Sequence, residues 1–495
     1  MYVIGLDVGT SGVKSTVFDD SARVTGRAYR EYDLITGSEG MYELDPRELL
    51  DKTLEALAQS VSNLDNKQVQ AICVTSFGES FICLDKNDNV LSNTMIYMDT
   101  RGAGECEEFA DRFGKRVIYE KSGQYVDPMF GAYKLRWVVK NKPEIIQKTK
   151  KLLFICDFIA YMLGADHCCE YSQAARSVLF DIHTKKWWDE AVDFAGIDRS
   201  VLPVPVPGAS VAGTLSRKHA ESLGMDTSVK LILGGQDQLL ALIGSGAGNA
   251  GAVTNSMGTV DCFTGLMDGD KVDIDTLIKY NLPMVPYIQD GCYATYSFNM
   301  SGGCIIKWFR DHLASDIAHL PEAYRLLDKE APGEPTKLSV IPYLAGGGTP
   351  YMNSTLPAVI AGLRLNTSRG ELYKAFLEGE TYEMKLALDC VSEAGIEVSR
   401  IITVGGGSAS SLWMQLRADI FDQELFIPEI SEAGVLGSAI LCYINLGMYD
   451  SILQAQEDIV RYKHTYKPKE KNVAVYRNNY DVYKQLYSAV KGIYR

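Results

Sequence analysis

One carboxylate stands where a buried strand is expected to end and an apolar helix to begin, near the middle of the chain. The stretch from Leu231 to Gly246 reads LILGGQDQLLALIGSG, an apolar run followed by two glycines and then by Asp237 in the first helical turn. A carboxylate there can cap orphan N–H groups and suits the positive end of the helix dipole. The same residue could serve as a general base, so this stretch alone leaves both roles open.

Three glycine-bearing turns follow or link predicted strands. They are DVGTSG at 7–12, NSMGT at 255–259 and GGGS at 405–408. Glycine lets several backbone N–H groups converge on one anion, and a following helix adds its dipole. One such sequence would indicate only a turn, whereas three in one chain favour nucleotide binding. These turns carry hydroxyls at Thr10, Ser11, Ser256, Thr259 and Ser408.

Two other nucleotide-binding motifs fail on their context. Residues 246–251 match G-x-G-x-x-G, but they follow a helix and precede a strand, the reverse of the dinucleotide fingerprint. GTSGVKS at 9–15 resembles the end of a P-loop, yet its spacing differs and a strand follows where a P-loop needs a helix. We therefore expect neither an NAD site nor a P-loop fold.

Strands and helices alternate around these turns. Strands are expected at 2–8, 13–18, 24–32, 70–75 and 400–404, and helices at 301–313, at 372–391 and after Pro46. Ser408 is expected to cap a helix that runs to Ile420, and helices at 434–449 and 480–494 to pack on the outside. The alternation predicts a parallel or mixed sheet covered by helices. The two similar hairpins suggest two related α/β halves, joined near 246–252.

The composition narrows the class of partner. A chain of 495 residues is too long for one hydrophobic core. Its formal net charge of −14 argues against nucleic acid or an anionic membrane surface as a binding partner. Eleven cysteines without a C-x-x-C pair and six histidines without ligand spacing predict neither a zinc site nor a disulfide framework. The start of the chain does not read as a signal peptide, and no apolar run is long enough to span a bilayer. A cytoplasmic protein that binds small metabolites is expected.

The motifs, in this order, resemble the FGGY carbohydrate kinases, which belong to the actin-like ATPase superfamily. GLDVGTSGVKSTVFD is similar to the first phosphate hairpin, YMDTR (97–101) to the substrate segment, and GAYKLRW (131–137), imperfectly, to the first family signature. GGQDQLLALIGSG resembles the catalytic-aspartate segment and NSMGT the second phosphate hairpin. AGLRLNTSRGELYKAFLE (361–378) resembles the second signature, and VGGGSASSLWMQLRADIF (404–421) the adenosine motif.

The resemblance implies an α/β fold of two ribonuclease-H-like, actin-like ATPase domains with an interdomain catalytic cleft. Residues 1–248 would bind the sugar and carry the first phosphate hairpin, and residues 249–495 would bind the nucleotide. The implied reaction is phosphorylation of a sugar or polyol hydroxyl by ATP with Mg²⁺, and a hinge near 246–251 would close the cleft. The implied partners are a small sugar and MgATP, with no nucleic acid and no membrane. The oligomeric state stays open, with a homodimer as one option.

The same resemblance assigns roles to single residues. Asp237 would be the general base, and the metal residues would be Asp7, which would hold Mg²⁺ through water, and Asp237. Trp413 is expected in the core of its helix, and Lys14 is as readily a surface charge as a phosphate ligand. The expected ATP-binding residues are Thr10, Ser11, Lys14, Gly258, Thr259, Gly406, Gly407 and Ser408.

The implied sugar-binding residues are Glu79, Asp99, Asp237 and Gln238, with Arg101 orienting Asp99 through a bidentate pair. Glu79 and Asp99 could equally be solvated loop carboxylates. The segment Ser76–Ser80 lacks both the N-Q-R-E-T pattern of glycerol kinases and the Q-M-H pattern of xylulokinases, whereas residues 171–216 resemble xylulokinases. A pentulose such as xylulose is the expected substrate. A polyol or deoxysugar kinase and a non-catalytic actin-like ATP-binding module are the alternatives.

Overall fold

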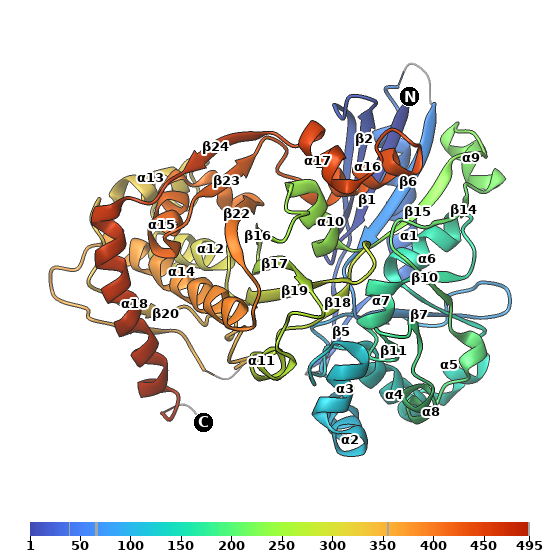
Figure 1. Ribbon diagram of the computed structural model, residues 1–495, viewed down its shortest axis with the longest axis horizontal. Helices are drawn as coiled ribbons and strands as arrows, with labels where there is room; N and C mark the ends of the chain where they lie inside the picture. Colours follow the sequence, from blue (N-terminus) through green and yellow to red (C-terminus); the bar gives the residue numbers. More distant parts are fainter. Residues whose placement is uncertain (39, 65–67, 354–355, 494–495) are drawn as a thin grey trace. The chain divides into compact units, whose positions relative to one another are not determined.

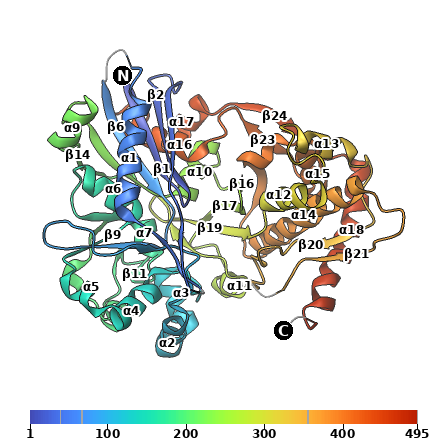
Figure 2. The same cartoon turned by 180° about the vertical axis from the view of Figure 1, so that it is seen from behind.

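The computed structural model describes residues 1–495 except 39, 65–67, 354–355 and 494–495. The chain forms two compact α/β units, which Figures 1 and 2 show from opposite sides. The first unit contains Met1–Gly248, Pro283–Ala294 and Glu432–Ile459; the second contains Asn249–Leu282, Thr295–Ser431 and Val460–Arg495. Within the described ranges, no helix is both long and apolar enough to cross a membrane. The division of function between 1–248 and 249–495 stays a prediction.

The first unit is built on a six-stranded mixed sheet. Its strands lie in the order β14 (Val211–Thr214), β15 (Lys230–Gln236), β6 (Val69–Ser76), β1 (Tyr2–Val8), β2 (Gly12–Asp19) and β3 (Val24–Glu31). Strands β15, β6 and β1 are parallel, while β1, β2 and β3 form an antiparallel meander. These bounds confirm the predicted strands and the first hairpin. Parallel strands with both faces covered read as nearly continuous apolar runs, which explains why they were recognisable in the sequence.

Several helices pack on the sheet of the first unit. On one face α1 (Pro46–Ser60) begins after Asp45, whose side chain caps it, and the hydroxyls of Ser15 and Ser60 lie 2.8 Å apart. Helix α16 (Ala433–Asn445) packs on β1 and α10 (Asp237–Ser245) so closely that a Cβ on Gly437 would lie 2.0 Å from the carbonyl of Leu240. The prediction that this helix packs on the outside is wrong, because α16 is apolar on nearly all sides and therefore buried.

The other elements of the first unit are short and lie around this core. The helices are α2 (Ala103–Phe113), α3 (Lys115–Ser122), α4 (Gly131–Asn141), α5 (Pro143–Lys148), α6 (Ile155–Leu163), α7 (Tyr171–Ala175), α8 (Asp189–Ala195), α9 (Arg217–Leu223) and α17 (Ile452–Ile459). The strands are β4 (Ile35–Thr36), β5 (Tyr42–Leu44), β7 (Phe81–Leu84), β8 (Thr94–Met95), β9 (Lys151–Phe154), β10 (Cys168–Glu170), β11 (Phe180–Asp181), β12 (Lys186–Trp187), β13 (Val204–Val206) and β18 (Val285–Pro286).

The second unit repeats the combination of a hairpin with parallel strands. In its sheet, neighbouring strands are β19 (Cys292–Asn299), β17 (Asp261–Asp268), β16 (Gly251–Met257), β22 (Val398–Val404), β23 (Leu425–Pro428) and β24 (Tyr462–Tyr466). Strand β16 is antiparallel to β17 and parallel to β22, as β1 is antiparallel to β2 and parallel to β6. The helices are α11 (Ile274–Lys279), α12 (Cys304–Leu313), α13 (Ala323–Glu330), α14 (Arg369–Glu393), α15 (Ser411–Phe421) and α18 (Glu470–Val490), and β20 (Ser339–Ile341) pairs with β21 (Val359–Ala361).

Hydrogen bonds from tyrosine hydroxyls join the C-terminal helix α18 to α14. Glu383 of α14 is almost completely buried and accepts hydrogen bonds from Tyr343 and Tyr483. Tyr480 donates to Asp389 at 2.8 Å. Burial raises the pKa of Glu383 to about 7, since no cation offsets its charge among the described groups that affect it. Helix α18 is thus held by bonds from neutral hydroxyls to carboxylates.

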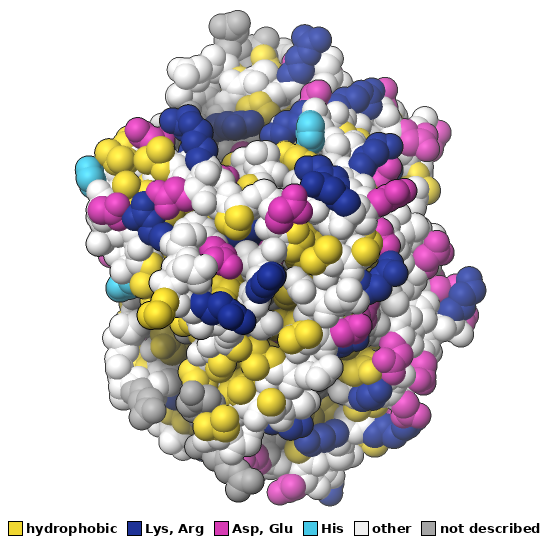
Figure 3. Space-filling model, turned by 90° about the vertical axis from the view of Figure 1, so that its left-hand side faces the viewer, with side chains coloured by type: hydrophobic (Ala, Val, Ile, Leu, Met, Phe, Trp, Pro, Cys, Tyr) yellow, Lys and Arg dark blue, Asp and Glu magenta, His cyan; other side chains and the backbone are white. Residues whose placement is uncertain are grey.

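Exposed hydrophobic side chains also occur in the second unit. Figure 3 shows one face of the molecule, where hydrophobic side chains gather below the centre among Lys, Arg, Asp and Glu side chains. Leu363 and Leu365, which follow β21, are 56% and 111% exposed. Single exposed apolar residues are normal on a protein surface, so the homodimer option remains a prediction.

Candidate functional site

Two aspartates lie at the same edge of the first sheet, where its parallel strands end. In the strand register Asp7 of β1 pairs with Thr75 of β6, and Gln236 of β15 pairs with Ser76. Asp237 follows directly as the first residue of α10, as the sequence predicted. The Thr75 hydroxyl donates to the carbonyl of Gly235 at 2.8 Å and so ties β6 to the turn before α10. The sheet therefore brings the two carboxylates to one place.

The surroundings of Asp237 raise its pKa above that of an ordinary aspartate. Its side chain keeps some exposure, yet the surrounding protein and the charge of Asp7 raise the pKa of Asp237 to about 7. A hydrogen bond from the backbone N–H of Gln238 and the charges of Arg176 and Lys14 act in the opposite direction. Asp237 thus accepts a first-turn N–H and also has a pKa suited to a base near neutral pH. The cap and base roles are compatible.

Asp7 has an unused acceptor in this place. Burial raises its pKa, which Lys14 lowers, and its Oδ1 atom is buried without a hydrogen-bond partner in the described part of the chain. A Cβ on Gly434, near the start of α16, would lie 3.7 Å from the other carboxylate oxygen. A buried orphan carboxylate oxygen at a strand end points to a missing donor or cation.

A chain of hydrogen bonds fixes the turn that carries Asp237. Gly235 adopts a φ of +92°, and a Cβ there would lie 2.3 Å from Oε2 of Glu170. Glu170 caps α7 and accepts from the hydroxyl of Ser172, which in turn accepts the backbone N–H of Gln236 at 3.0 Å. These contacts hold the residue before Asp237, and only glycine fits at position 235.

Tyr97 joins the first hairpin to the surroundings of Asp237. Burial raises the pKa of Tyr97, the charge of Asp237 raises it further, and a hydrogen bond with the Thr10 side chain lowers it. Sequence reasoning singled out Asp99 and Arg101 of the YMDTR segment and missed Tyr97, although it opens that segment.

Two other predicted phosphate-binding residues of the first hairpin lie at the surface. Ser11 is exposed, and Lys14 borders a surface groove of about 500 Å³ lined also by Thr16, Arg27, Ala28, Tyr29, Arg30, Gln59 and Glu432.

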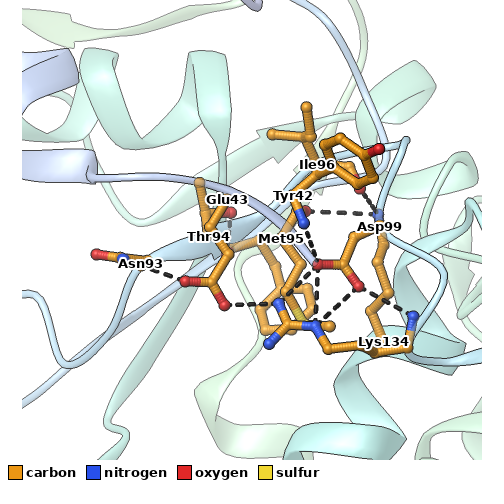
Figure 4. Close-up of polar contacts among 10 residues, drawn as sticks. Tyr42, Glu43, Asn93, Thr94, Met95, Ile96, Asp99 and Lys134 are labelled. Carbon is orange, nitrogen blue, oxygen red and sulfur yellow. Dashed lines mark hydrogen bonds and ion pairs between the residues drawn. The ribbon is translucent and has the colours of Figure 1, made fainter. Parts of the chain in front are cut away.

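The Asp99 carboxylate is enclosed by protein groups (Figure 4). It is fully buried and accepts from the backbone N–H of Tyr42 at 3.0 Å. Arg101 forms the expected bidentate pair with it, since Nε donates to Oδ1 at 3.0 Å and an η nitrogen donates to Oδ2 at 2.6 Å; the same η nitrogen also donates to Glu43 at 2.6 Å. Lys134, also fully buried, donates to the carbonyl of Ile96 at 3.0 Å. Asp99 is therefore not a solvated loop carboxylate, and both of its oxygens are used inside this cluster.

Glu79 is also buried, at 4% exposure, but its surroundings differ. One carboxylate oxygen accepts from Arg176, which lies on the chain just after α7. Arg176 was not among the predicted residues, because nothing local in the sequence marks an arginine 97 residues away from its partner. Gln238 lies one residue after Asp237 in the first turn of α10 and is partly exposed. Asp7, Thr10, Lys14, Glu79 and Asp237 thus all belong to the first unit.

The predicted nucleotide residues of the second unit meet at one edge of its sheet. Strands β16 and β22 are parallel with Ser256 opposite Val404, so the 257–260 turn and the 405–408 turn are neighbours. Gly405 has a φ of +89°, and a Cβ on it would lie 2.6 Å from the carbonyl of Met257. Around this edge lie Gly258 and Thr259, which are exposed, together with Gly406, Gly407 and Ser408.

The helix after the 405–408 turn begins later than predicted. Gly406–Ala409 form a 3₁₀ turn, so Ser410 rather than Ser408 caps α15, with its hydroxyl accepting the N–H of Trp413 at 3.1 Å. The expectation that Ser408 is the cap is wrong, because the glycines allow one extra tight turn before the helix. Trp413 is buried and donates to the Thr381 hydroxyl at 3.2 Å, which confirms its core position.

Comparison with known proteins covers nearly the whole chain. The family models for the N-terminal and C-terminal domains of the FGGY family of carbohydrate kinases match residues 2–244 and 253–446. A xylulose kinase of Bacillus subtilis (strain 168) is 27% identical over 497 residues, 99% of this chain and 98% of that protein. A gluconokinase of Bacillus licheniformis is 27% identical over 504 residues, with 100% and 97% covered. The crystal structure of ligand-bound xylulose kinase from Lactobacillus acidophilus superimposes with a TM-score of 0.92 at 24% identity, with 100% and 99% covered.

Proposed function

The chain belongs to the FGGY family of carbohydrate kinases, a family with the actin-like ATPase fold, and we propose that its sugar substrate is a ketopentose such as xylulose. The observation that carries the site is the placement of Asp237 beside Asp7 at the end of the parallel strands, with a pKa of about 7. A carboxyl group with this pKa is about half ionised at neutral pH, so it can both accept and release a proton there. It therefore suits a base that accepts the proton of an attacking hydroxyl.

In the proposed reaction, the hydroxyl oxygen of the sugar attacks the γ-phosphorus of ATP while Asp237 takes the hydroxyl proton. The bond from the γ-phosphorus to the β-phosphate oxygen breaks, and ADP leaves with that electron pair. Gly406, Gly407 and Ser408 would flank the adenosine. Thr10, Ser11, Lys14, Gly258 and Thr259 would bind the phosphates, because converging N–H groups, hydroxyls and an ammonium group neutralise developing charge.

The chain's carboxylates suit a hard cation that keeps most of its water. In the described residues, no group of three or more His, Cys, Asp or Glu side chains is arranged to hold a metal. Mg²⁺ needs only one or two carboxylates together with water and phosphate oxygens, and Asp7 offers an oxygen without a partner, with Asp237 beside it. Bound there with ATP, Mg²⁺ would neutralise phosphate charge.

The choice of a ketopentose rests on the xylulose kinase relative and on the xylulokinase-like segment 171–216. An aldonate is the second candidate, because the gluconokinase relative is equally similar in sequence. The acidic side chains Asp7, Asp237 and Glu79 favour a neutral acceptor over one that carries its own carboxylate.

The test is acceptor-dependent ADP release from purified protein with MgATP and, separately, D-xylulose, D-ribulose, glycerol and D-gluconate. Turnover with a ketopentose at a higher kcat/KM than with gluconate or glycerol is expected. ADP release that no acceptor increases would instead favour a non-catalytic ATP-binding module. Asp237→Asn should lower kcat by about 10²- to 10⁴-fold, with Tm and ATP affinity nearly unchanged. The matched control is Asp189→Asn, at the first residue of α8, which is exposed and should keep full activity.

A further inference from the structure

A buried ion pair joins Glu79 to Arg176 near Asp237. Arg176 is 5% exposed and Glu79 is 4% exposed. Both Nε and an η nitrogen of Arg176 contact the same oxygen, Oε1 of Glu79. The charge of Arg176 also reaches Asp237, whose pKa it lowers. The pair therefore lies in the electrostatic field of the proposed base.

The Arg176 guanidinium is held in place from several sides. Its other η nitrogen donates to the side-chain carbonyl of Gln124 at 3.1 Å, and its centre lies 4.9 Å from the ring centroid of Phe130. A Cβ on Gly78 would lie 3.2 Å from Cγ of Arg176, so the stem of the arginine occupies the space beside the loop backbone. An arginine fixed in this way can orient a carboxylate with little loss of further side-chain entropy.

Glu79 pays a conformational cost to be in this place. Its φ is +67°, a backbone conformation that residues other than glycine rarely adopt and that costs about 1 kcal/mol or more. Such strain persists only where the surroundings enforce it, and it concentrates at functional sites. Arg176 contacts the side chain of this residue through both Nε and an η nitrogen.

The two buried acidic residues of the predicted sugar loops differ in one decisive respect. Both oxygens of Asp99 are occupied by Arg101 and by backbone N–H groups. In Glu79 only Oε1 is occupied, and Oε2 has no hydrogen-bond partner among the described residues. Oε2 is not among the fully buried orphan atoms either, so it borders accessible space. Glu79, and not Asp99, has an acceptor to offer a ligand.

We propose that Arg176 is a specificity-determining residue of this kinase, which positions Glu79 so that Oε2 accepts a hydroxyl hydrogen of the sugar. This inference rests on the proposed function and extends it to the class of acceptor. An ionised carboxylate can only accept hydrogen bonds. A neutral polyhydroxy sugar supplies the donor, whereas an aldonate that placed its carboxylate there would supply no hydrogen and would add a like charge. Arg176 thus selects neutral acceptors through Glu79.

The experiment compares wild type with Arg176→Gln, Arg176→Lys and Glu79→Gln. Kinetics with D-xylulose and with D-gluconate, at varied MgATP, give KM for each substrate, and calorimetric titration with D-xylulose alone gives a Kd that does not depend on turnover. Arg176→Gln should raise both the KM and the Kd for D-xylulose at least tenfold and change the KM for ATP less than twofold. Arg176→Lys, which keeps the charge without the planar fork, should recover part of that loss. Glu79→Gln should lower the xylulose-to-gluconate ratio of kcat/KM at least tenfold.

The matched control is Arg136→Gln, in the same unit. Arg136 also donates through Nε to a glutamate, Glu108, at 2.8 Å, bonds a carbonyl through an η nitrogen, and lies over an aromatic ring, Phe194, at 4.0 Å. It should lower Tm without changing KM or Kd. If Arg176→Gln behaves in the same way, the arginine is merely structural and the inference is overturned.

The remaining outcomes separate the inference from the proposed substrate. If wild type binds D-xylulose but releases no ADP with it, the proposed substrate is wrong, and the effect of Arg176→Gln on Kd still decides the role of Arg176. If wild type prefers gluconate to every neutral acceptor, or binds no neutral sugar at all, the inference is overturned. A selective loss of D-xylulose affinity in Arg176→Gln, with ATP affinity kept, supports it.

Discussion

Replacing Glu383 with Gln should change the free energy of unfolding, relative to wild type, more favourably at pH 8 than at pH 5.5. Glu383 lies between α14 and α18, where burial raises its pKa from 4.5 to about 7 although two tyrosine hydroxyls donate to it. Between pH 4.5 and pH 7 the folded protein therefore holds a proton that the unfolded chain has released. The stability that this bound proton contributes is fully present below pH 4.5 and is lost as the pH rises through 7.

The size of the effect follows from that pKa. Raising a carboxyl pKa from 4.5 to about 7 corresponds to ~3 kcal/mol of unfavourable ionisation in the fold, of which ~2 kcal/mol develops between pH 5.5 and pH 8. Gln cannot ionise, so the variant avoids this loss. Its amide group faces two hydroxyl donors and adds a cost of ~1–3 kcal/mol, but that cost is the same at both pH values. The difference between the two pH values isolates the ionisation.

The assay is urea unfolding of wild type and variant at pH 5.5 and pH 8, with hydrogen exchange of α14 and α18 peptides as a local readout. Both pH values lie above the pI of about 5.1, which limits precipitation. The control is Glu393→Gln at the exposed end of the same helix, where hydrogen bonds from Tyr280 and Lys279 lower the pKa of the carboxyl. Its pH effect should be small and of opposite sign. Equal pH dependence of stability in wild type and Glu383→Gln would refute the reasoning.

Two glycine substitutions test the close contacts on which the two sheets depend. Gly405→Ala should destabilise the protein by ~1–3 kcal/mol and raise the KM for ATP, because the φ of Gly405 is +89° and the new Cβ would lie 2.6 Å from the Met257 carbonyl. Its control is Gly406→Ala, which should leave Tm unchanged because the new Cβ would meet nothing within 4 Å. Gly437→Ala should lower the free energy of unfolding by ~1–3 kcal/mol, because its Cβ would lie 2.0 Å from the Leu240 carbonyl, whereas Gly104→Ala in α2 meets nothing within 4 Å. Thermal unfolding measures both pairs, and equal Tm values within either pair would contradict the packing described.

The strands and the placement of Asp237 could be predicted because their signals are local. An apolar run, two glycines and a carboxylate lie within a few residues of one another, and the fold preserves that order in β15 and α10. The first hairpin was equally readable, since β1 and β2 are separated only by a short glycine turn. Sequence periodicity is reliable where one element explains its own pattern.

Apart from the cap at Ser408, which a local 3₁₀ turn displaces to Ser410, the errors and omissions concern contacts between distant parts of the chain. Nothing near Glu79 indicates that Arg176 will hold it, and nothing near Asp237 indicates that Ser172 will bind the turn before it. Helix α16 was expected to pack on the outside, whereas most of its residues are buried. Gly437 of α16 instead lets α10 approach closely, and Gly5 of β1 lets that strand approach the backbone of α16 at Val435. These close contacts appear only when the partner surfaces are known.

The place of α16 in the first unit also has a consequence for synthesis on the ribosome. The strands it covers are among the first to be made, whereas the helix and the segment after it extend to Ile459 of a 495-residue chain. Until they emerge, the faces of β1 and α10 that pack on α16 have no native cover. A nascent chain of this protein must therefore carry an unfinished N-terminal core through most of translation, and chaperones that shield apolar surface are expected to bind it during that interval.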